Sequence, residues 1–514
     1  MAKIGVNKIR AGVPAPSAIF LADRIEKMRA RSSKSWLERG KKQALALFAR
    51  TATEVPAYKN FLAASHIKPA HINSFDDFAA VSTISKSYIR EHSAQELMWH
   101  GTTATPHIYT ATSGSTGKPA YFARSKTVDQ NTSLLHELFF RSTTLNPERS
   151  TLVVDCFGMG IWIGGLITYE AFERLQSRGY PFAIITPGIN KTEIFKALKE
   201  LLPNYDQLIL IGYPPFIKDI VDEAGENNVT FENKEVALLF AAEAFTESFR
   251  EYLAEKVGIS NLLANTANIY GTAELGAMAI ETPLSILIRR LALANRPLFE
   301  RLFGPITKTP TLAQFNPESV LFEGVGGNLI ITGDSAMPLV RYALGDQGNV
   351  HTFDEIERLC GEHGIDLVHE MTKAGMTHTM TKLPFVHVYE RADLSTTLYG
   401  LLIYPETIKE VLLRKEFASF LTGKLALVTR YNESHDQYLE VNIELRPDAQ
   451  APATMHKHLA AQIVENLREK NAEFSELWKF VGERALPKLV FWPNGDPQYF
   501  KPGVKQKWVV KESK

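Results

Sequence analysis

The densest group of side chains suited to chemistry lies in the loop formed by residues 109–119. Its two glycines, Gly114 and Gly117, let backbone N–H groups approach an anion without obstruction by a Cβ atom. Hydroxyl groups and one amine add further donors: Ser113, Ser115, Thr116 and Lys118. This composition predicts a polyphosphate-binding loop. The alternative is a polar surface turn, because glycine, serine and threonine are common turn residues.

The loop differs from two other glycine motifs. A Walker loop has four residues between its glycines and a serine or threonine after its lysine. Here two residues separate Gly114 from Gly117, and Pro119 follows Lys118. A nucleophile elbow has three residues between its glycines, with a serine in the middle. The sequence therefore indicates neither a P-loop NTPase nor an α/β-hydrolase.

The order of residues in this loop resembles that of the acyl-adenylate-forming superfamily, which includes acyl-CoA synthetases and nonribosomal adenylation domains. Residues 54–59 and 75–90 resemble more specifically its phenylacetate–CoA ligase-like branch. Further segments follow in the order that the family has: Ala241–Glu243, Tyr270–Glu274, Arg341–Asp346, Arg391–Asp393, Tyr399–Glu406 and Gly503–Lys507. The resemblance extends through nearly the whole chain, and the ordered set is more specific than any single motif.

The resemblance implies a role for several of these residues, and the chemistry of each side chain fits its role. Tyr270 would stack on adenine, and Thr272 would contact the α-phosphate. Glu274 would hold the Mg²⁺ ion that bridges the phosphates. Asp346 would accept hydrogen bonds from both ribose hydroxyls. Lys505 would bridge the attacking carboxylate and the α-phosphate.

The same resemblance adds Lys118 to the catalytic residues and implies further nucleotide contacts at Ala242, Glu243, Gly271 and Arg391. Structural alternatives remain at three positions. Tyr270 could simply end a strand before a turn, and Asp346 could stabilise the turn at Gly345. Lys505 could be a solvated tail lysine, in which case Lys507 is the second candidate for its role.

Three sites depart from the pattern of the family. Residues 241 and 242 are alanines where small glycines are usual, and they would crowd the edge of the adenine. Residues 343 and 344 are Ala and Leu, so two polar contacts near the ribose are missing. Glu390 replaces a glycine at the joint between domains, which predicts a slower or altered domain rotation. These changes leave the chemistry of ATP intact. They affect more the second step that the resemblance implies, which is transfer of the acyl group to an acceptor.

A second glycine-containing segment, residues 158–164, follows an apolar run and is similar to a dinucleotide-binding fingerprint. It has one residue too many between its second and third glycines, which favours a tight passage from a strand to a helix. By the resemblance, Phe157, Trp162 and Ile163 would line an acyl pocket, which would then be apolar.

Two other features favour structural interpretations. The 14 histidines include no HExxH motif and no paired ligand spacing, which argues against a histidine metal site. Residues 284–303 are apolar with four interspersed arginines. We expect this segment to pack its apolar face internally and to solvate its arginines, with docking on a membrane or a partner as the alternative.

The pattern of apolar residues predicts an α/β protein. Residues 36–48 and 76–91 have helical spacing. From Thr151 on, strand-like runs at 151–156, 182–186, 208–212 and 236–242 alternate with helical segments at 191–202 and 216–227. Such alternation predicts a mostly parallel sheet covered by helices. Beyond Gly326 the chain becomes β-rich, with strands at 328–332 and 347–352.

Residues 385–393 are predicted to form a joint. After it we expect a helix at 405–414, strands at 424–430 and 438–446, a helix at 453–474 and a strand at 488–492, in a split βαβ arrangement. The prediction is therefore a large domain over residues 1–390 that binds ATP and the acid. A small α+β lid over residues 391–514 would carry the catalytic lysine.

The composition narrows the class of protein. Lys+Arg and Asp+Glu both total 57, so no net charge favours nucleic acid or an anionic membrane. Cys156 and Cys360 form no CxxC pair, which fits a reducing cytoplasm. Residues 1–26 lack the apolar run of a signal peptide, and the most apolar stretch, residues 152–168, contains Asp155 and four glycines. No transmembrane segment is expected.

The resemblance implies that the chain converts a carboxylic acid to its acyl-AMP with ATP and Mg²⁺ and releases pyrophosphate. Transfer of the acyl group to coenzyme A would follow. One alternative is an enzyme that hands the acyl group to an amine, a hydroxyl or a carrier-protein thiol. Another is a nucleotide-binding protein that has lost its chemistry and serves a partner. The sequence leaves open whether the acid is aromatic or fatty, and also the oligomeric state.

Overall fold

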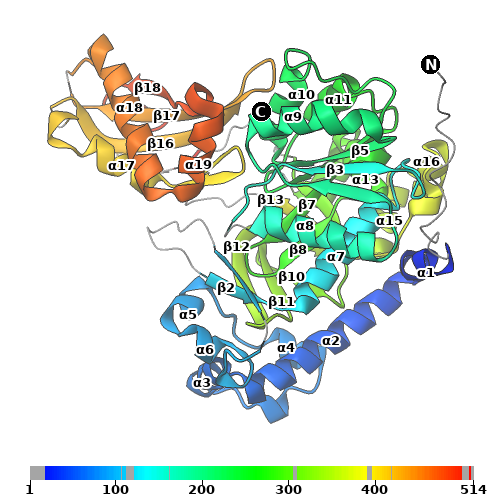
Figure 1. Cartoon of the computed structure of the whole chain (residues 1–514). Helices are drawn as coiled ribbons and strands as arrows, with labels where there is room; N and C mark the ends of the chain where they lie inside the picture. Colours follow the sequence, from blue (N-terminus) through cyan, green and yellow to red (C-terminus); the bar gives the residue numbers. More distant parts are fainter. Residues whose placement is uncertain are drawn as a thin grey trace, which may run out of the picture.

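The structure is a computed structural model that describes residues 18–105, 107–111, 121–160, 163–304, 309–389, 396–417, 419–447, 449–500 and 509–510. Its N-terminal part is helical: α1 (Ala18–Arg29), α2 (Ser33–Glu54), α3 (Pro56–Ala64), α4 (Phe75–Ala79), α5 (Lys86–Glu91) and α6 (Ala94–Leu97). Helix α2 is long and crosses the base of the molecule in Figure 1. The helix predicted over residues 76–91 is two short helices, because Ile84 between them pairs with Tyr342 of a strand.

The centre of the molecule is one eleven-stranded sheet in the order β10-β11-β12-β13-β9-β8-β7-β6-β5-β3-β4. Its strands are β3 (Thr151–Asp155), β4 (Phe182–Ile185), β5 (Gln207–Gly212), β6 (Glu235–Ala241), β7 (Thr266–Thr272), β8 (Gly276–Ile280), β9 (Thr311–Phe315), β10 (Val320–Val325), β11 (Asn328–Gly333), β12 (Leu339–His351) and β13 (Phe385–Tyr389). Strands β4, β3, β5, β6 and β7 are parallel to one another. In the rest of the sheet, from β7 through β8, β9, β13, β12 and β11 to β10, each strand is antiparallel to its neighbour. The predicted parallel and β-rich parts are therefore two halves of a single sheet.

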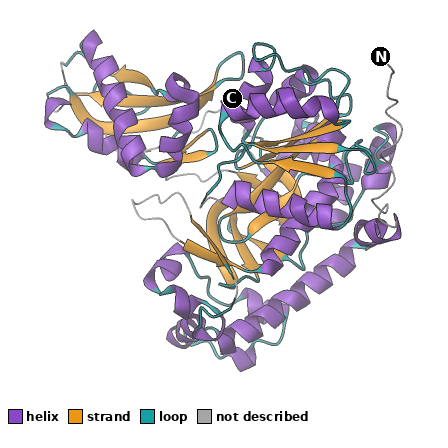
Figure 2. Cartoon of the chain, viewed as in Figure 1, coloured by secondary structure: helices purple, strands orange, loops and turns teal. Residues whose placement is uncertain are grey.

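Helices cover both faces of the parallel half (Figure 2). They are α7 (Lys126–Phe140), α8 (Ile163–Ser177), α9 (Lys191–Leu201), α10 (Pro214–Glu223) and α11 (Glu247–Lys256). Side chains of β3 alternate between the two faces, because Leu152 and Val154 join the core with α9 and α10 while Val153 joins the core with α7 and α8. Both faces are thus buried, and this explains the nearly continuous apolar runs in the sequence.

The other strands and α-helices described before the C-terminal part are a two-stranded antiparallel sheet and five helices. The sheet consists of β1 (Ile108–Ala111) and β2 (Tyr121–Arg124), and the helices are α12 (Leu262–Asn265), α13 (Pro283–Ala294), α14 (Arg296–Phe303), α15 (Phe353–Glu362) and α16 (Leu367–Lys373). The expectation that residues 284–303 solvate all their arginines is wrong for Arg289, which is 1% exposed. Its guanidinium pairs with the buried carboxylates of Glu247 and Glu281.

The structure also corrects the joint predicted at residues 385–393. Residues 385–389 form β13, a buried strand between β12 and β9. Residues 390–393, which complete the predicted joint, lie outside the described residues.

The described residues between 396 and 510, here called the C-terminal unit, form a smaller group of elements. These are β14 (Thr396–Leu398), β15 (Leu401–Ile403), α17 (Pro405–Leu412), β16 (Leu421–Tyr431), β17 (Gln437–Leu445), α18 (Ala453–Lys470), α19 (Ala472–Val481) and β18 (Lys488–Trp492). Strands β16 and β17 are antiparallel and β18 adds in parallel, as expected for an α+β unit. The single helix predicted over 453–474 divides at Asn471, whose side chain caps α19.

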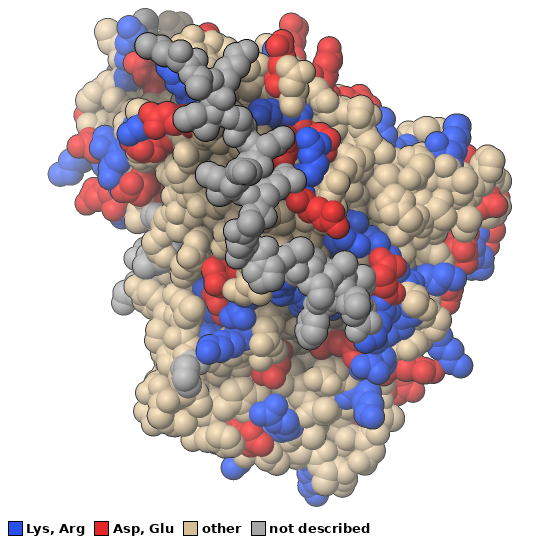
Figure 3. All heavy atoms as spheres, turned by 45° about the vertical axis from the view of Figure 1, so that its right-hand side comes forward, with Lys and Arg blue, Asp and Glu red and all other residues tan. Residues whose placement is uncertain are grey.

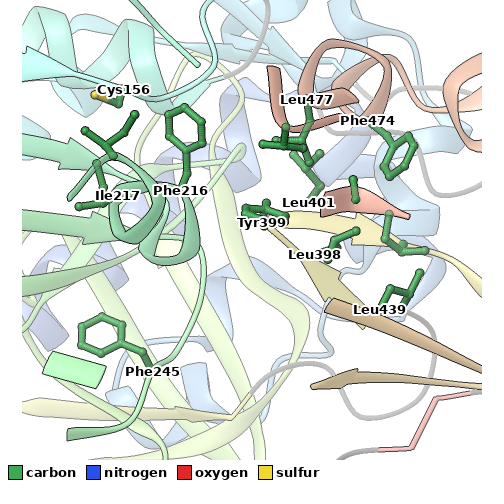
Figure 4. Packing of buried hydrophobic residues seen from close by; sticks show 14 of the residues in the cluster. Cys156, Phe216, Ile217, Phe245, Leu398, Tyr399, Leu401, Leu439, Phe474 and Leu477 are labelled. Carbon is green, nitrogen blue, oxygen red and sulfur yellow. The ribbon is translucent and has the colours of Figure 1, made fainter. Parts of the chain in front are cut away.

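The C-terminal unit packs against α10 and its neighbours through apolar side chains (Figure 4). Phe216 and Ile217 of α10 belong to the same buried cluster as Tyr399 and Phe474 of the C-terminal unit. An ion pair at 2.7 Å joins Lys218 of α10 to Asp436. Another, at 2.5 Å, joins Asp219 to Arg484.

The surface shows no segregation of charge on the face seen in Figure 3, where basic and acidic side chains are intermixed. This agrees with the equal totals of both signs in the sequence. None of the described helices combines the length and the apolar character needed to cross a bilayer.

Candidate active site

A cavity of about 500 Å³ lies where the parallel strands β6 and β7 end. The two strands are neighbours, with Ala241 opposite Ile269. The motifs at the ends of these strands, Ala241–Glu243 and Tyr270–Glu274, therefore meet at one edge of the sheet, and both line the cavity. Ligands of open α/β sheets bind at this edge, beyond the carboxyl ends of the strands.

Tyr270 and Asp346 are in direct contact at this cavity. The Tyr270 hydroxyl donates a hydrogen bond of 2.6 Å to Asp346 Oδ2, and both residues line the cavity. Asp346 belongs to β12, which is four strands away from β7 in the sheet. In a flat sheet these strands would be ~19 Å apart. The sheet must therefore curve, and its curvature brings the two predicted nucleotide-binding residues together.

Thr272, the last residue of β7, and Glu274, in the turn that follows β7, also line this cavity. Glu274 is 5% exposed and accepts a hydrogen bond of 3.2 Å from the Tyr342 hydroxyl. The Thr272 hydroxyl makes only a weak contact of 3.8 Å with Met278 Sδ among the described residues. Gly271 also lines the cavity, and an added Cβ would lie 2.7 Å from the Gly276 carbonyl oxygen.

The arrangement around Glu274 fits a magnesium ion that is shared with phosphates. Within the described residues no group of three or more His, Cys, Asp or Glu side chains could hold a metal ion. Mg²⁺ typically takes one or two carboxylates together with phosphate oxygens and water, rather than a cage made only of protein ligands. A single carboxylate in the cavity wall is sufficient for such a site.

The loop predicted to bind phosphate begins at the same place. The buried Thr110 hydroxyl on β1 donates a hydrogen bond of 3.1 Å to the carbonyl oxygen of Ala273. Ala111, the last residue of β1, lines the cavity. The loop residues themselves lie outside the described residues: Ser113, Gly114, Ser115, Thr116, Gly117 and Lys118.

Glu243 has a contact that the sequence did not indicate. Its carboxylate accepts hydrogen bonds from the Gly400 N–H group and, at 2.7 Å, from Gln437 Nε2, and both donors belong to the C-terminal unit. The preceding residue, Ala242, has φ 77°. That left-handed conformation favours glycine, so alanine is strained at this position, where the resemblance implies a small glycine.

Two of the residues that were predicted to line an acyl pocket belong to another wall of the cavity. Phe157 and Ile163 line it, and Phe157 packs edge-on against Tyr213 with 5.0 Å between ring centroids. Residues 156–160 lead from β3 toward α8, which agrees with the predicted passage from a strand to a helix. Trp162 lies outside the described residues.

The predicted residues of the joint and the tail are not described. Arg391 and Glu390 fall in the segment 390–395, and Lys505 and Lys507 fall in the segment 501–508. Their roles remain predictions.

Sequence reasoning did not single out several titratable or polar residues of the cavity wall. Three of them stand on helices: His136 on α7, Thr168 on α8 and Glu473 on α19. Burial raises the pKa of Glu473 to about 7 and lowers the pKa of His136 to about 4. All three stand in ordinary amphipathic helices, so no local pattern marks them.

Solved structures with the same arrangement of elements belong to 2-hydroxyisobutyryl-CoA ligase. Its complex with 2-HIB-AMP and CoA in the thioesterification state has a TM-score of 0.61 and 15% identity, and the match covers 95% of this chain and 92% of that chain. The chain has the fold of an acyl-CoA ligase. This is the fold that the resemblance to the acyl-adenylate-forming superfamily implies.

Two other states of that ligase match less closely. The postadenylation state with 2-HIB-AMP has a TM-score of 0.53 at 14% identity, covering 96% of this chain and 93% of that chain. The open conformation with 2-HIB-AMP and CoA has a TM-score of 0.51 at 15% identity, covering 96% and 95%. No family model and no curated protein matches the sequence.

Proposed function

We propose that the chain is an acyl-adenylate-forming ligase that converts a carboxylic acid to its acyl-AMP and then transfers the acyl group to coenzyme A. One observation carries this proposal: the Tyr270–Asp346 pair, the Glu274 carboxylate and the start of the loop at Ala111 line a single cavity. These elements are distant in the sequence, and each has the chemistry for a different part of ATP.

The proposed residue roles follow the geometry of the cavity. Tyr270 offers an aromatic face to adenine, and Asp346 offers carboxylate oxygens to the ribose hydroxyls. Glu274 would hold Mg²⁺ at the phosphates, where the ion neutralises charge. Thr272 would donate to the α-phosphate. Two further donors, Lys118 and Lys505, would complete the site from segments outside the described residues.

Adenylation requires attack of a carboxylate oxygen on the α-phosphorus, with pyrophosphate as the leaving group. Negative charge accumulates on the phosphoryl oxygens as the new bond forms. Donors that are held in place stabilise this charge without a covalent bond to the protein, and removal of one such donor typically slows a reaction by about 10²–10³-fold. The product mixed anhydride has AMP as a good leaving group, which makes the acyl group ready for transfer.

Transfer to coenzyme A is the second part of the proposal, with residues 1–390 and 391–514 acting as two domains. Gly400 and Leu402 of the C-terminal unit line the cavity, and Gly400 binds Glu243. The higher TM-score to the thioesterification state, 0.61 against 0.53 for the postadenylation state, supports an arrangement suited to acyl transfer. During adenylation, rotation of the C-terminal unit would move Gly400 and Leu402 away from the cavity and bring Lys505 to it.

The proposal is tested by ATP–pyrophosphate exchange over a panel of aromatic and aliphatic acids. We expect exchange that depends on the acid, and its loss in Glu274→Gln. Asp366→Asn alters the carboxylate that caps the N-terminus of α16, and this variant should exchange as the wild type does. Binding of ATP without exchange for any acid would indicate a nucleotide-binding protein instead.

Addition of coenzyme A to an acid that is activated then identifies the acceptor. A thioester detected by mass spectrometry supports the ligase, whereas acyl-AMP that persists until an amine, an alcohol or a carrier protein is added supports the alternative enzyme.

Both cysteines of the chain, Cys156 and Cys360, are buried and unpaired, which supports the proposed cytoplasmic location.

A further inference from the structure

The wall of the cavity formed by α7 and α8 contains a buried histidine with an unused nitrogen. His136 is 1% exposed, and its Nδ1 lies 2.8 Å from the carbonyl oxygen of Thr132. A carbonyl oxygen can only accept, so Nδ1 carries the hydrogen and Nε2 is an acceptor. Nε2 is buried and has no hydrogen-bond partner among the described residues. Burial lowers the pKa of this imidazole to about 4, so it is neutral near pH 7.

The second polar group of this wall is the hydroxyl of Thr168. Thr168 on α8 is 3% exposed and lines the cavity, and its hydroxyl has no hydrogen bond to the described residues. Thr168 is one helical turn from Phe172, so both side chains are on the same face of α8. The His136 ring meets Phe172 edge-on, with 5.4 Å between centroids. Both residues therefore contribute to the part of the cavity wall that α7 and α8 form.

The rest of this wall is apolar, with Phe157, Ile163 and Ile167 as its larger side chains. A buried acceptor that lacks a donor is unfavourable, and native proteins usually satisfy such groups with protein, water or ligand. A hydroxyl group of a ligand can donate to His136 Nε2 and accept from the Thr168 hydroxyl at the same time. An ammonium group has no acceptor and could satisfy only the first of these contacts.

We propose that the acid activated here carries a hydroxyl group on an otherwise apolar body, and that His136 and Thr168 recognise this hydroxyl. The inference rests on the proposed function, because it names the class of acid that enters that same cavity. A hydroxy acid would pair both polar groups, whereas the matching acid without the hydroxyl would leave them buried and unpaired. We expect a preference of about 10- to 100-fold in kcat/KM for the hydroxy acid.

The test compares matched pairs of acids in ATP–pyrophosphate exchange. Each pair consists of an acid and its hydroxylated form, for example phenylacetate with 4-hydroxyphenylacetate, and aliphatic acids with hydroxyl groups at successive carbons. The ratio of kcat/KM values within a pair is measured for the wild type, Thr168→Val and His136→Phe. Two further variants complete the set: His136→Gln, which keeps an acceptor, and Thr53→Val, which changes an exposed threonine of α2.

We expect at least one pair in which the wild type prefers the hydroxy acid, with the ratio falling toward one in Thr168→Val and His136→Phe. His136→Gln should retain part of the preference, and Thr53→Val all of it. Thr168→Val changes the shape of the side chain little, so it remains informative if His136→Phe fails to fold. Exchange with equal or better use of the unsubstituted acid in every pair would overturn the hydroxyl recognition and leave the proposed function standing. No exchange with any acid, while ATP still binds, would overturn both.

Discussion

Replacing Asp346 with asparagine removes one charge from the nucleotide site without changing the size of the side chain. In the structure the carboxylate accepts from the Tyr270 hydroxyl at 2.6 Å and lines the cavity. A carboxylate can accept from both hydroxyls of a ribose, whereas an amide offers one oxygen and a nitrogen that only donates. Asp346→Asn should therefore lose one hydrogen bond to ribose and weaken the other.

The size of this effect follows from the charge on the acceptor. A hydrogen bond to a charged group contributes about 1.5–3 kcal/mol. Loss of one such bond and weakening of a second should cost about 2–4 kcal/mol, which is on the order of 30- to 700-fold in the Kd for ATP. Titration calorimetry with ATP measures this change directly.

A second ligand makes the test specific to ribose. The wild type should bind 2′,3′-dideoxy-ATP more weakly than ATP by a similar factor, whereas Asp346→Asn should hardly distinguish the two nucleotides. Asp354→Asn, an exposed position on α15, is the matched control and should bind ATP as the wild type does. The reasoning is refuted if Asp346→Asn binds ATP normally, or if it still discriminates against the dideoxy nucleotide as strongly as the wild type.

Three further predictions concern polar groups that are buried or half-buried. Burial raises the pKa of Glu473 to about 7, so between about pH 4.5 and pH 7 the folded protein holds a proton that the unfolded chain has released. The free energy of unfolding should therefore fall as the pH rises through this window. The Tm of Glu473→Gln, relative to that of the wild type, should increase across the same window. Arg289→Met leaves two buried carboxylates with one fewer cation, and it should lower the free energy of unfolding by about 3–5 kcal/mol in thermal or denaturant unfolding. Gln437→Leu removes a donor to Glu243 across the contact with the C-terminal unit, and it should slow thioester formation more than ATP–pyrophosphate exchange.

Controls for these predictions come from the same chain. Arg296→Met changes an exposed arginine on α14 and should alter stability by less than about 0.5 kcal/mol. A Tm difference for Glu473→Gln that stays constant with pH would contradict the raised pKa. Equal slowing of both half-reactions in Gln437→Leu would mean that its contact with Glu243 has no special part in acyl transfer.

The sequence predicted the parallel half of the sheet well because both faces of those strands are buried. Residues such as Leu208 and Ile209 of β5 are both apolar although they face opposite cores. Strand β13 was missed because His387 and Tyr389 are polar and the arginine-containing joint motif follows directly. In the fold His387 is buried, and burial together with His351 lowers its pKa to about 3.

Side chains whose partners come from distant segments were the least predictable. The burial of Arg289 depends on Glu247 and Glu281, which approach it only after α11 and β8 have packed. The motif residues Tyr270 and Asp346 were found from the resemblance, but their contact depends on curvature of the sheet, which no local pattern encodes. His136 and Thr168 have no motif at all, and only the shared cavity wall relates them.

The central claim is that the loop of residues 109–119, Glu274 and Asp346 converge on one nucleotide. A crystal structure of the protein with AMP or a stable acyl-AMP analogue tests it most directly. The account predicts adenine against the Tyr270 ring, ribose hydroxyls within hydrogen-bond distance of Asp346 and the phosphate beside Thr272. A nucleotide bound outside this cavity, or bound in it with its ribose away from Asp346, would contradict the account.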